Sequence, residues 1–569
     1  MRFKSNSIHS QETAQRQNSV NKPKRTAMLR QFTLGVALLG LTACSPFGSK
    51  DADDTARGTI GYVKGFIGGV AADEPRAVLI GRNVLSAGGT ASDAAVAVYF
   101  ALSVTLPSSA SLGGGGVCLV RDQASNTIET LDFRALEPAG PVPAGKVPVA
   151  IPGNPLGFYA LHTKYGRLKW AELIRPAENL ARFGNQISRA LGQDISLTGK
   201  KLLTHADSRQ IFAGDGTNTL LGEGDFLKQT ELSGMLARIR SLGGARFYSG
   251  PFAREIVSAV EAVGGALKYE NLRAYRPQWR PPISVPWIKQ TTLHFPSPPG
   301  TAGPTAAQIS AMLKYDDLYQ DGNESVRAHL LAEAIERSLA DRKNWDGSSV
   351  PRVADNQLAT PERAHRLMQT FKGDRRIVTP GAATASLDPT SQASGSSFSV
   401  LDRRGSAVAC SLSMNQPFGS GRVARGTGVL LAAPTGDQYS GPSFASTILA
   451  GTFKGSTYYV SASSGGALAP TSLVNVSIDA LNNDDSTLES AINRKRVHHG
   501  GADGITYLES GTAKSVVEGL AKRGHKLAFV NSMGAVNAVL CPSGIPHKEI
   551  IDCSALTDPR GFGLALSTQ

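Results

Sequence analysis

The chain has 569 residues, with 41% apolar and 18% charged positions, which indicates a globular protein with a large buried core. Its formal net charge of +13 would suit a nucleic-acid partner only if the basic residues were clustered. No basic tract with interleaved aromatic residues is present, so no nucleic-acid partner is expected.

The N-terminal 43 residues read as a signal peptide with a basic extension. An apolar run from Phe32 to Ala43 follows basic residues and is too short to span a bilayer as a stable helix. The run ends in Leu-Thr-Ala-Cys, which resembles a bacterial lipoprotein processing box with Cys44 as the lipidated residue. The alternative is an ordinary secretory signal followed by a chance cysteine. We expect residues 44–57 to be the lipidated Cys and a tether, and the protein to be a periplasm-facing lipoprotein of the cell envelope, in the outer membrane.

Removing residues 1–43 changes the charge and leaves four cysteines besides Cys44. Seven Lys or Arg and one Glu lie in that segment, so the net charge falls by six, from +13 to +7. In an oxidising compartment Cys541 and Cys553, twelve residues apart across a Pro/Gly loop, could pair. The sequence has no CxxC and no Cys/His cluster, and the adjacent His498 and His499 are not at helical ligand spacing, so no metal is expected and this His pair is assigned a structural role.

The first half of the fold is predicted to be mainly helical. Residues 91–106 are small and apolar throughout, which indicates a buried, closely packed helix. A glycine-rich turn then leads into two strands, joined by a hairpin near Gln123–Asn126. Helical periodicity continues over 156–345, interrupted by a Pro-rich strand region at 276–304.

The second half is predicted to contain more strands. Polar loop signals fill 346–397, and strands return at 397–411, 427–433 and 456–462. A glycine-rich turn at "SGGALAP" then enters a helix. The pattern predicts helix-rich outer layers around an antiparallel sheet core, with the chain divided by a long loop near residue 395.

The stretch "SQASGSSFSVLDRRGSAVA" places hydroxyl-rich residues directly before an alternating apolar strand, as a nucleophile at a strand's start would require. It belongs to a series of stretches that, taken in order over roughly residues 58–567, resemble the gamma-glutamyltranspeptidase family. The series consists of "GGTASDAAVAVYFALSVTLPSSASLGGGG", "LDFRALEPAG", "IPGNPLGFYALHTKYGRLKWAELIRPAENLARFG", "ENLRAYRPQWRPPI", "HLLAEAIERSLADR", "FSVLDRRGSAV", "FGSG", "SSGG", "RKRVHHG", "RGHKLAFVNSMGAVNAV" and "DPRGFG".

This resemblance implies an α+β fold, the four-layer αββα sandwich of N-terminal-nucleophile hydrolases. It implies a precursor that cuts itself into a large-subunit-like region, 58–394, and a small-subunit-like region, 395–569. The new N-terminal Thr would be both nucleophile and, through its α-amino group, base, so that no cofactor is needed.

The resemblance also implies how a small gamma-glutamyl or amino-acid ligand is held. A cation and hydrogen-bond donors would bind the α-carboxylate and a carboxylate would bind the α-ammonium. By the matching motifs Arg134 and Ser443 would contact the carboxylate, and Asn415 and Asp437 the ammonium. The backbone N–H groups of the glycine pair would form the oxyanion hole. That pair is Gly465 and Gly466.

The sequence departs from the family at the nucleophile. The family's Thr-Thr-His-Phe/Tyr-Ser aligns with Gly395–Ser399, and the ungapped spacing from Phe398 to Asn415 puts Gly395, which has no hydroxyl, at the nucleophile position. Ser396 or Ser394 could substitute, but a slip of one residue on a strand turns the side chain to the opposite face. Two further departures are Pro442 in place of a serine and the altered loop at 432–438.

Two functions are therefore the main candidates from the sequence, and a third, acyl transfer by an unrelated Ser/His pair, has little support because the sequence places no partner for His498 or His499. The first is a gamma-glutamyltransferase or glutathione-hydrolase-like enzyme with Ser396 as a substitute nucleophile. The second is a catalytically silent, uncleaved binding or scaffold lipoprotein.

Overall fold

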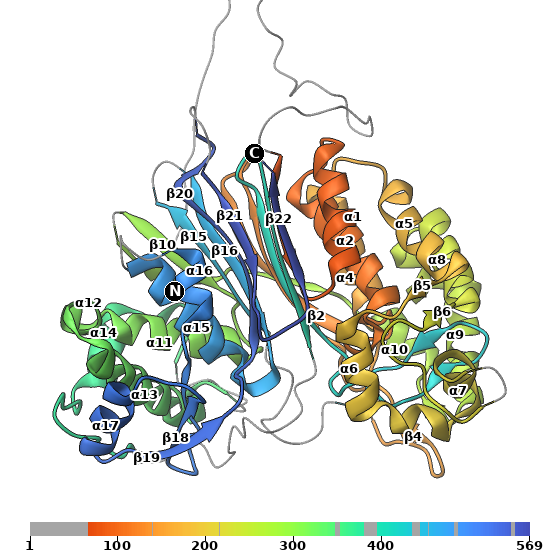
Figure 1. Ribbon diagram of the computed structural model, residues 1–569. Coiled ribbons are helices and arrows are strands. Elements are labelled where there is room, and N and C mark those ends of the chain that lie inside the picture. The colour runs from red at the N-terminus through yellow and green to blue at the C-terminus, as the bar shows by residue number, and fades with distance from the viewer. Residues whose placement is uncertain are drawn as a thin grey trace, which may run out of the picture. The chain divides into compact units, whose positions relative to one another are not determined.

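The computed structural model describes residues 67–138, 140–214, 217–288, 290–346, 353–380, 395–434, 444–452, 455–482, 487–547 and 552–568. From residue 67 onward the described residues form one compact unit. Two antiparallel sheets lie face to face at its centre, and each carries a layer of helices on its outer face (Figure 1). This is the four-layer αββα sandwich that the resemblance implies. Every helix in the described part of the chain is too short or too polar to span a bilayer.

The first sheet combines strands from both sides of residue 395. Its seven strands lie in the order β22 (Leu564–Thr568), β1 (Gly68–Ala72), β11 (Ser396–Asp402), β12 (Ala407–Ser413), β2 (Gly115–Asp122), β3 (Thr127–Phe133) and β8 (Gln278–Arg280). The predicted hairpin is confirmed, since Asp122 pairs with Thr127 at the end of the β2–β3 ladder.

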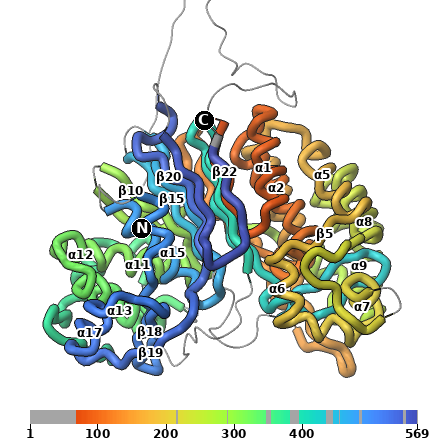
Figure 2. The backbone as a smooth tube through the Cα atoms, in the orientation of Figure 1, coloured from red at the N-terminus to blue at the C-terminus, as the bar shows by residue number. Residues whose placement is uncertain are grey.

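The second sheet has six strands, in the order β21 (Ser554–Thr557), β20 (Ala535–Ile545), β16 (Thr457–Ser464), β15 (Ala445–Gly451), β10 (Thr291–Phe295) and β9 (Ile283–Pro286). Figure 2 shows the two sheets side by side, with β22 of the first sheet and β20 of the second both in blue. A small apolar core that includes Leu119, Leu401, Ala462 and Val539 fills the space between them.

Helices cover the outer face of the first sheet. The buried helix predicted at 91–106 is confirmed as α2 (Ala91–Thr105), of which every residue is buried. Thr90 and Asp93 form a capping box at its start, and the Asp93 carboxylate also accepts the Leu168 N–H. The layer also contains α1 (Pro75–Ser86), α3 (Pro107–Ala110), α4 (Asn154–Tyr165), α5 (Trp170–Phe183), α6 (Arg189–Thr198), α7 (Ala206–Phe212), α8 (Thr230–Leu242), α9 (Gly250–Ala262) and α10 (Tyr269–Ala274).

The helices on the second sheet come from both halves of the chain, and a small sheet extends this layer. The helices are α11 (Ala302–Leu313), α12 (Leu318–Asp321), α13 (Glu324–Asp341), α14 (Pro361–Met368), α15 (Ala469–Asn482), α16 (Leu488–Asn493) and α17 (Lys514–Lys522). The small sheet contains β17 (Val497–His499), β18 (Ile505–Glu509) and β19 (Lys526–Val530).

Some element predictions need correction. The single strand expected at 397–411 is two strands, β11 and β12, because a turn at 403–406 reverses the chain. Helix α14 lies inside the predicted loop 346–397, and β15 was not predicted. Both elements are short, so their periodicity is weak in the sequence.

The four described cysteines form two disulfides. Cys541 and Cys553 are bonded, as the sequence suggested. Cys118 on β2 and Cys410 on β12 form a second bond between directly opposed residues, 292 positions apart. This second disulfide covalently joins the regions on either side of residue 395.

Removing the Cys118–Cys410 bond should destabilise the protein more than removing the Cys541–Cys553 bond. A cross-link over 292 residues restricts the unfolded chain more than one over twelve. We expect the free energy of unfolding to fall by about 5 kcal/mol for Cys118→Ala/Cys410→Ala and by about 3 kcal/mol for Cys541→Ala/Cys553→Ala. Urea unfolding followed by circular dichroism would measure both; equal losses would contradict the assignment.

Candidate active site

Residue Gly395 lies at an edge of the first sheet where four strands begin or end together. It directly precedes β11, and β12 ends beside it, since Ser396 pairs with Leu412. Ser413, the last residue of β12, pairs with Gly115, the first residue of β2. Gly116 pairs in turn with Phe133, so Arg134 directly follows β3 at the same edge.

The first residues of β11 face alternate sides of the sheet. Phe398 and Val400 point into the core under the helices of the first sheet. Ser397 faces the second sheet, where its Oγ accepts a hydrogen bond from Asn537 Nδ2 at 2.9 Å and donates to the Ala462 carbonyl at 3.4 Å. Ser396 therefore shares the helix-facing side with Phe398, as the strand period requires.

The Ser396 hydroxyl is not presented toward the space between the sheets. The residue is fully buried, and its Oγ has no hydrogen-bond partner among the described residues. Gly395 lies on the same side of the strand as Ser397, and among the described residues a Cβ built on it would meet only the Leu412 carbonyl oxygen, at 3.3 Å. There is thus room for a side chain at position 395 on the side of the strand that faces the second sheet, opposite to Ser396.

Arg134 and Asn415 lie close together at this edge. The Arg134 guanidinium is bound by both carboxylate oxygens of Asp132, at 3.0 and 3.1 Å, and about a fifth of the side chain is exposed. Two of its five N–H donors are used in this way, so others remain for a ligand carboxylate. Asn415 has a left-handed φ of 64°, and its amide donates to the carbonyls of Ala135 and Ala433.

The glycine pair lies where β16 turns into a helix. Gly465 and Gly466 have φ values of 124° and 57°, which side chains rarely adopt. A Cβ on Gly465 would lie 2.6 Å from the Gly534 Cα, so the close approach also requires glycine. The turn leads into the 3-10 helix Gly466–Leu468 and then into α15. Shortly before the turn, the carbonyl of Ala462 accepts a hydrogen bond from Ser397. Backbone N–H groups at a helix start suit a developing oxyanion.

Asp73 is a polar residue of this edge that the sequence analysis did not identify. It directly follows β1, and its carboxylate accepts the Ser397 N–H at 2.8 Å and the Asn537 amide at 2.7 Å. Burial raises the pKa of Asp73, and the hydrogen bonds from Ser397, Asn537 and Ser464 oppose that rise. Asp73 thus links the first residues of β11 to β20 and to the residue before Gly465.

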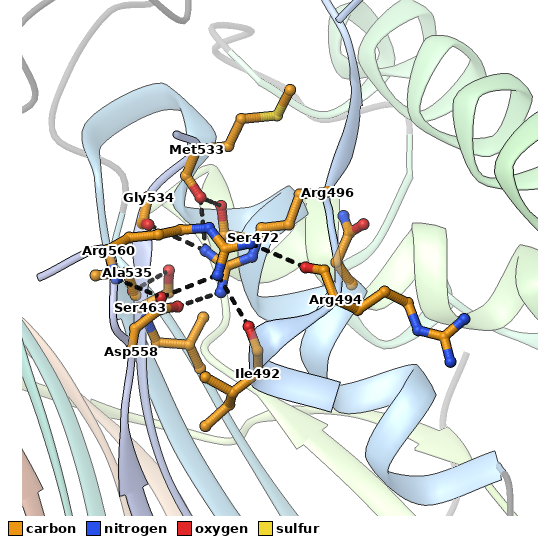
Figure 3. Close-up of polar contacts among 12 residues, drawn as sticks. Ser463, Ser472, Ile492, Arg494, Arg496, Met533, Gly534, Ala535, Asp558 and Arg560 are labelled. Carbon is orange, nitrogen blue, oxygen red and sulfur yellow. Dashed lines mark hydrogen bonds and ion pairs between the residues drawn. The ribbon is translucent and has the colours of Figure 1, made fainter. Parts of the chain in front are cut away.

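A buried ionic cluster holds the backbone segment against which the glycine turn packs. Figure 3 shows Arg496 and Arg560 directed at Asp558, and Arg496 donates to the carbonyls of Met533 and Gly534. Arg496 and Asp558 are each about 1% exposed. Since Gly534 is the residue against which Gly465 packs, this cluster fixes the position of the turn.

Some of the residues singled out from the sequence lie outside the described part of the chain. Asp437, Ser443 and Cys44 lie outside the described residues, as do Pro442 and Ser394. The described part of the predicted site therefore consists of Arg134, Asn415, Ser396, Gly465 and Gly466.

The adjacent His498 and His499 are fully buried on β17. His498 Nδ1 is 3.1 Å from Thr471 Oγ1, and His499 Nδ1 accepts the Gly501 N–H. Burial, with Arg376 nearby, lowers the pKa of His499 to about 2. This environment agrees with the structural role assigned to the pair.

His499 should make the protein less stable in acid. Its pKa is lower in the folded state than the usual 6.5, so its contribution is complete above pH 6.5 and is lost as pH falls toward about 2. Between pH 7.5 and 5 the wild type should lose about 2 kcal/mol that His499→Asn does not lose. Urea unfolding of both proteins at the two pH values measures this loss. An equal loss in the wild type and in His499→Asn would contradict the low pKa of His499.

The four layers and the strand edge at residue 395 define the class of protein: the fold is that of the N-terminal-nucleophile hydrolases. The solved structure of cephalosporin acylase from Bacillus halodurans superposes with a TM-score of 0.74 at 21% identity, over 91% of this chain and 99% of that one. A family model described as Gamma-glutamyltranspeptidase matches residues 77–444 and 442–567. The chain belongs to the gamma-glutamyltranspeptidase family.

Relatives of nearly the same length support this membership. The glutathione hydrolase proenzyme of Escherichia coli (strain K12) is 29% identical over 536 residues, which cover 87% of this chain and 90% of the relative. That of Bacillus subtilis (strain 168) is 30% identical over 510 residues, which cover 81% and 85%.

Proposed function

We propose that this chain is a catalytically silent, uncleaved member of the family that binds a small amino-acid or gamma-glutamyl ligand. The observation that carries the proposal is the start of β11: Gly395 offers no hydroxyl, and the Ser396 hydroxyl is buried on the opposite face. The family's chemistry needs a hydroxyl and a new α-amine on one residue. Glycine supplies only the amine.

The proposed ligand contacts are those that a gamma-glutamyl group needs. Arg134 would bind the α-carboxylate through the donors that Asp132 leaves, with Ser443 beside it. Asn415 and Asp437 would bind the α-ammonium. Opposite charges at the two ends fix the orientation of a small zwitterion, and no cofactor enters this scheme.

The proposed location in the cell rests on the sequence of the N-terminal residues 1–44. The basic residues, the apolar run Phe32–Ala43 and the Leu-Thr-Ala-Cys box support lipidation at Cys44. The protein would then be tethered to the outer membrane and face the periplasm. Metabolic labelling with a palmitate analogue tests this, and loss of the label in Cys44→Ser is the expected result.

The experiment on the site measures ligand binding and turnover with the same protein. We expect calorimetry to detect glutamate or glutathione binding, and Arg134→Gln to weaken it roughly tenfold or more, as loss of a charged hydrogen bond does. Arg189→Gln removes an exposed ion pair with Glu223 and is the matched control. Release of p-nitroaniline from gamma-glutamyl-p-nitroanilide should be absent. Unchanged binding in Arg134→Gln would contradict the ligand assignment.

A second candidate is a hydrolase in which Ser396 replaces the missing Thr. It is favoured by the Ser396 Oγ, which has no hydrogen-bond partner among the described residues. Turnover that Ser396→Ala abolishes would establish this candidate and overturn the silent one.

A further inference from the structure

Three buried side chains that do not belong to the site described above meet in the helical layer of the second sheet. His329 and Glu333 lie one turn apart on α13, so they share a face of that helix. His525 joins them from the turn between α17 and β19. His329 and Glu333 are fully buried and His525 is 6% exposed. Their ligand atoms all lie within 4.8 Å of one another.

The two imidazoles face each other through one nitrogen each. His329 Nδ1 and His525 Nε2 are 2.8 Å apart, so a single proton lies between them. The outer nitrogens are also held: His329 Nε2 lies 2.8 Å from the Lys372 carbonyl, and His525 Nδ1 lies 2.9 Å from Thr506 Oγ1. Metal-binding histidines are oriented in the same way, through their second nitrogen.

We propose that His329, Glu333 and His525 form a binding site for a borderline divalent metal ion of the zinc, nickel or cobalt class. His329 would bind through Nδ1 and His525 through Nε2. The His525 proton would move from Nε2 to Nδ1, where it donates to Thr506, so the number of bound protons is unchanged. Two imidazoles and a carboxylate are the ligands that these ions accept.

For the two histidine nitrogens the geometry needs only a small adjustment. Zinc–nitrogen bonds of about 2.0–2.1 Å at a tetrahedral angle place two ligand nitrogens about 3.3 Å apart, so the rings must separate by about half an ångström. Glu333 accepts the Ile377 N–H at 3.1 Å and pairs with Arg337 at 2.5 Å. Each carboxylate oxygen has a second lone pair for a metal.

The charges around the site balance. Arg337, Arg376 and Arg523 lie near the cluster, and so do three acids. These acids are Glu333, Glu336 and Asp374. The ion would therefore enter an electrically neutral neighbourhood rather than a net positive one.

The ion would act as a structural cross-link. It would tie α13 and the Lys372 backbone to β18, through Thr506, and to the α17–β19 turn. Those elements come from both sides of residue 395. Like the Cys118–Cys410 disulfide, the site would hold the two regions together.

The test is metal binding by the full untagged chain after treatment with a chelator. Calorimetry with Zn²⁺ alone should give about one tight site per chain, with a dissociation constant below about 1 µM, and Zn²⁺ should raise the melting temperature. His525→Gln should weaken this site at least tenfold. His205→Gln, on a histidine outside the cluster, is the matched control and should leave it unchanged.

Two results would overturn the proposal: no bound Zn²⁺ in the wild type, or the same affinity in His525→Gln. If that variant does not fold, Co²⁺ absorption of the wild type decides the matter. Intense visible bands of a low-coordinate nitrogen and oxygen site would support the proposal, and a spectrum of hydrated Co²⁺ would overturn it.

Discussion

Gly395→Thr is expected to restore cleavage of the chain before residue 395 without restoring gamma-glutamyl turnover. Within the described part of the chain a Cβ at this position meets only the Leu412 carbonyl oxygen, at 3.3 Å. The φ of Gly395 lies outside the left-handed region, so a β-branched residue fits after a small shift. The new hydroxyl would lie on the face that Ser397 shares. Turnover should stay absent because Pro442 and the altered loop at 432–438 still depart from the family.

The control is Gly395→Val, which has the shape of threonine without its hydroxyl. Reducing denaturing gels should show two fragments for Gly395→Thr after incubation and one intact chain for Gly395→Val. Cleavage in both would point to a contaminating protease. A folded Gly395→Thr that stays intact would show that the defect extends beyond position 395.

Asp558→Asn is expected to lower the free energy of unfolding by about 3–5 kcal/mol, the cost of leaving a buried charge unpaired. Burial lowers the pKa of Arg496 and Asp558 opposes that effect, so the arginine depends on this carboxylate. Asp558 also accepts the Val536 N–H and binds Arg560, which adds to the loss. This is a large part of the stability of a typical domain.

Lys514→Ala supplies the matched control. Its pair with Glu518 is exposed, with 88% and 66% of the two side chains accessible, so its removal should change stability by less than about 0.5 kcal/mol. Urea midpoints compare the two variants. A loss below about 1 kcal/mol in Asp558→Asn would contradict the role assigned to the cluster.

The sequence predicts what depends on local pattern. The uninterrupted apolar run of α2 and the β2–β3 hairpin are both found at the predicted positions. The opposite facing of Ser396 and Ser397 follows from the strand period alone. The same pattern predicts helix-rich outer layers around an antiparallel sheet core, and the family resemblance added that this core is two facing sheets in a four-layer sandwich.

Long-range pairings could not be predicted in this way. Cys118 and Cys410 are 292 residues apart, and only the β2–β12 register brings them together. Asp73 and Asn537 meet across an even longer separation, because β1 and β20 lie in facing sheets. His525 is likewise remote from His329 in the sequence. No local signal marks these residues as neighbours.

The most direct test of the central claim is the length of the purified wild-type chain. It must be measured after reduction, since the Cys118–Cys410 bond would hold two fragments together. A reducing gel with intact mass and N-terminal sequencing should show one chain continuous through residue 395. A small fragment whose N-terminus is Ser396 would contradict the claim and make Ser396 the nucleophile.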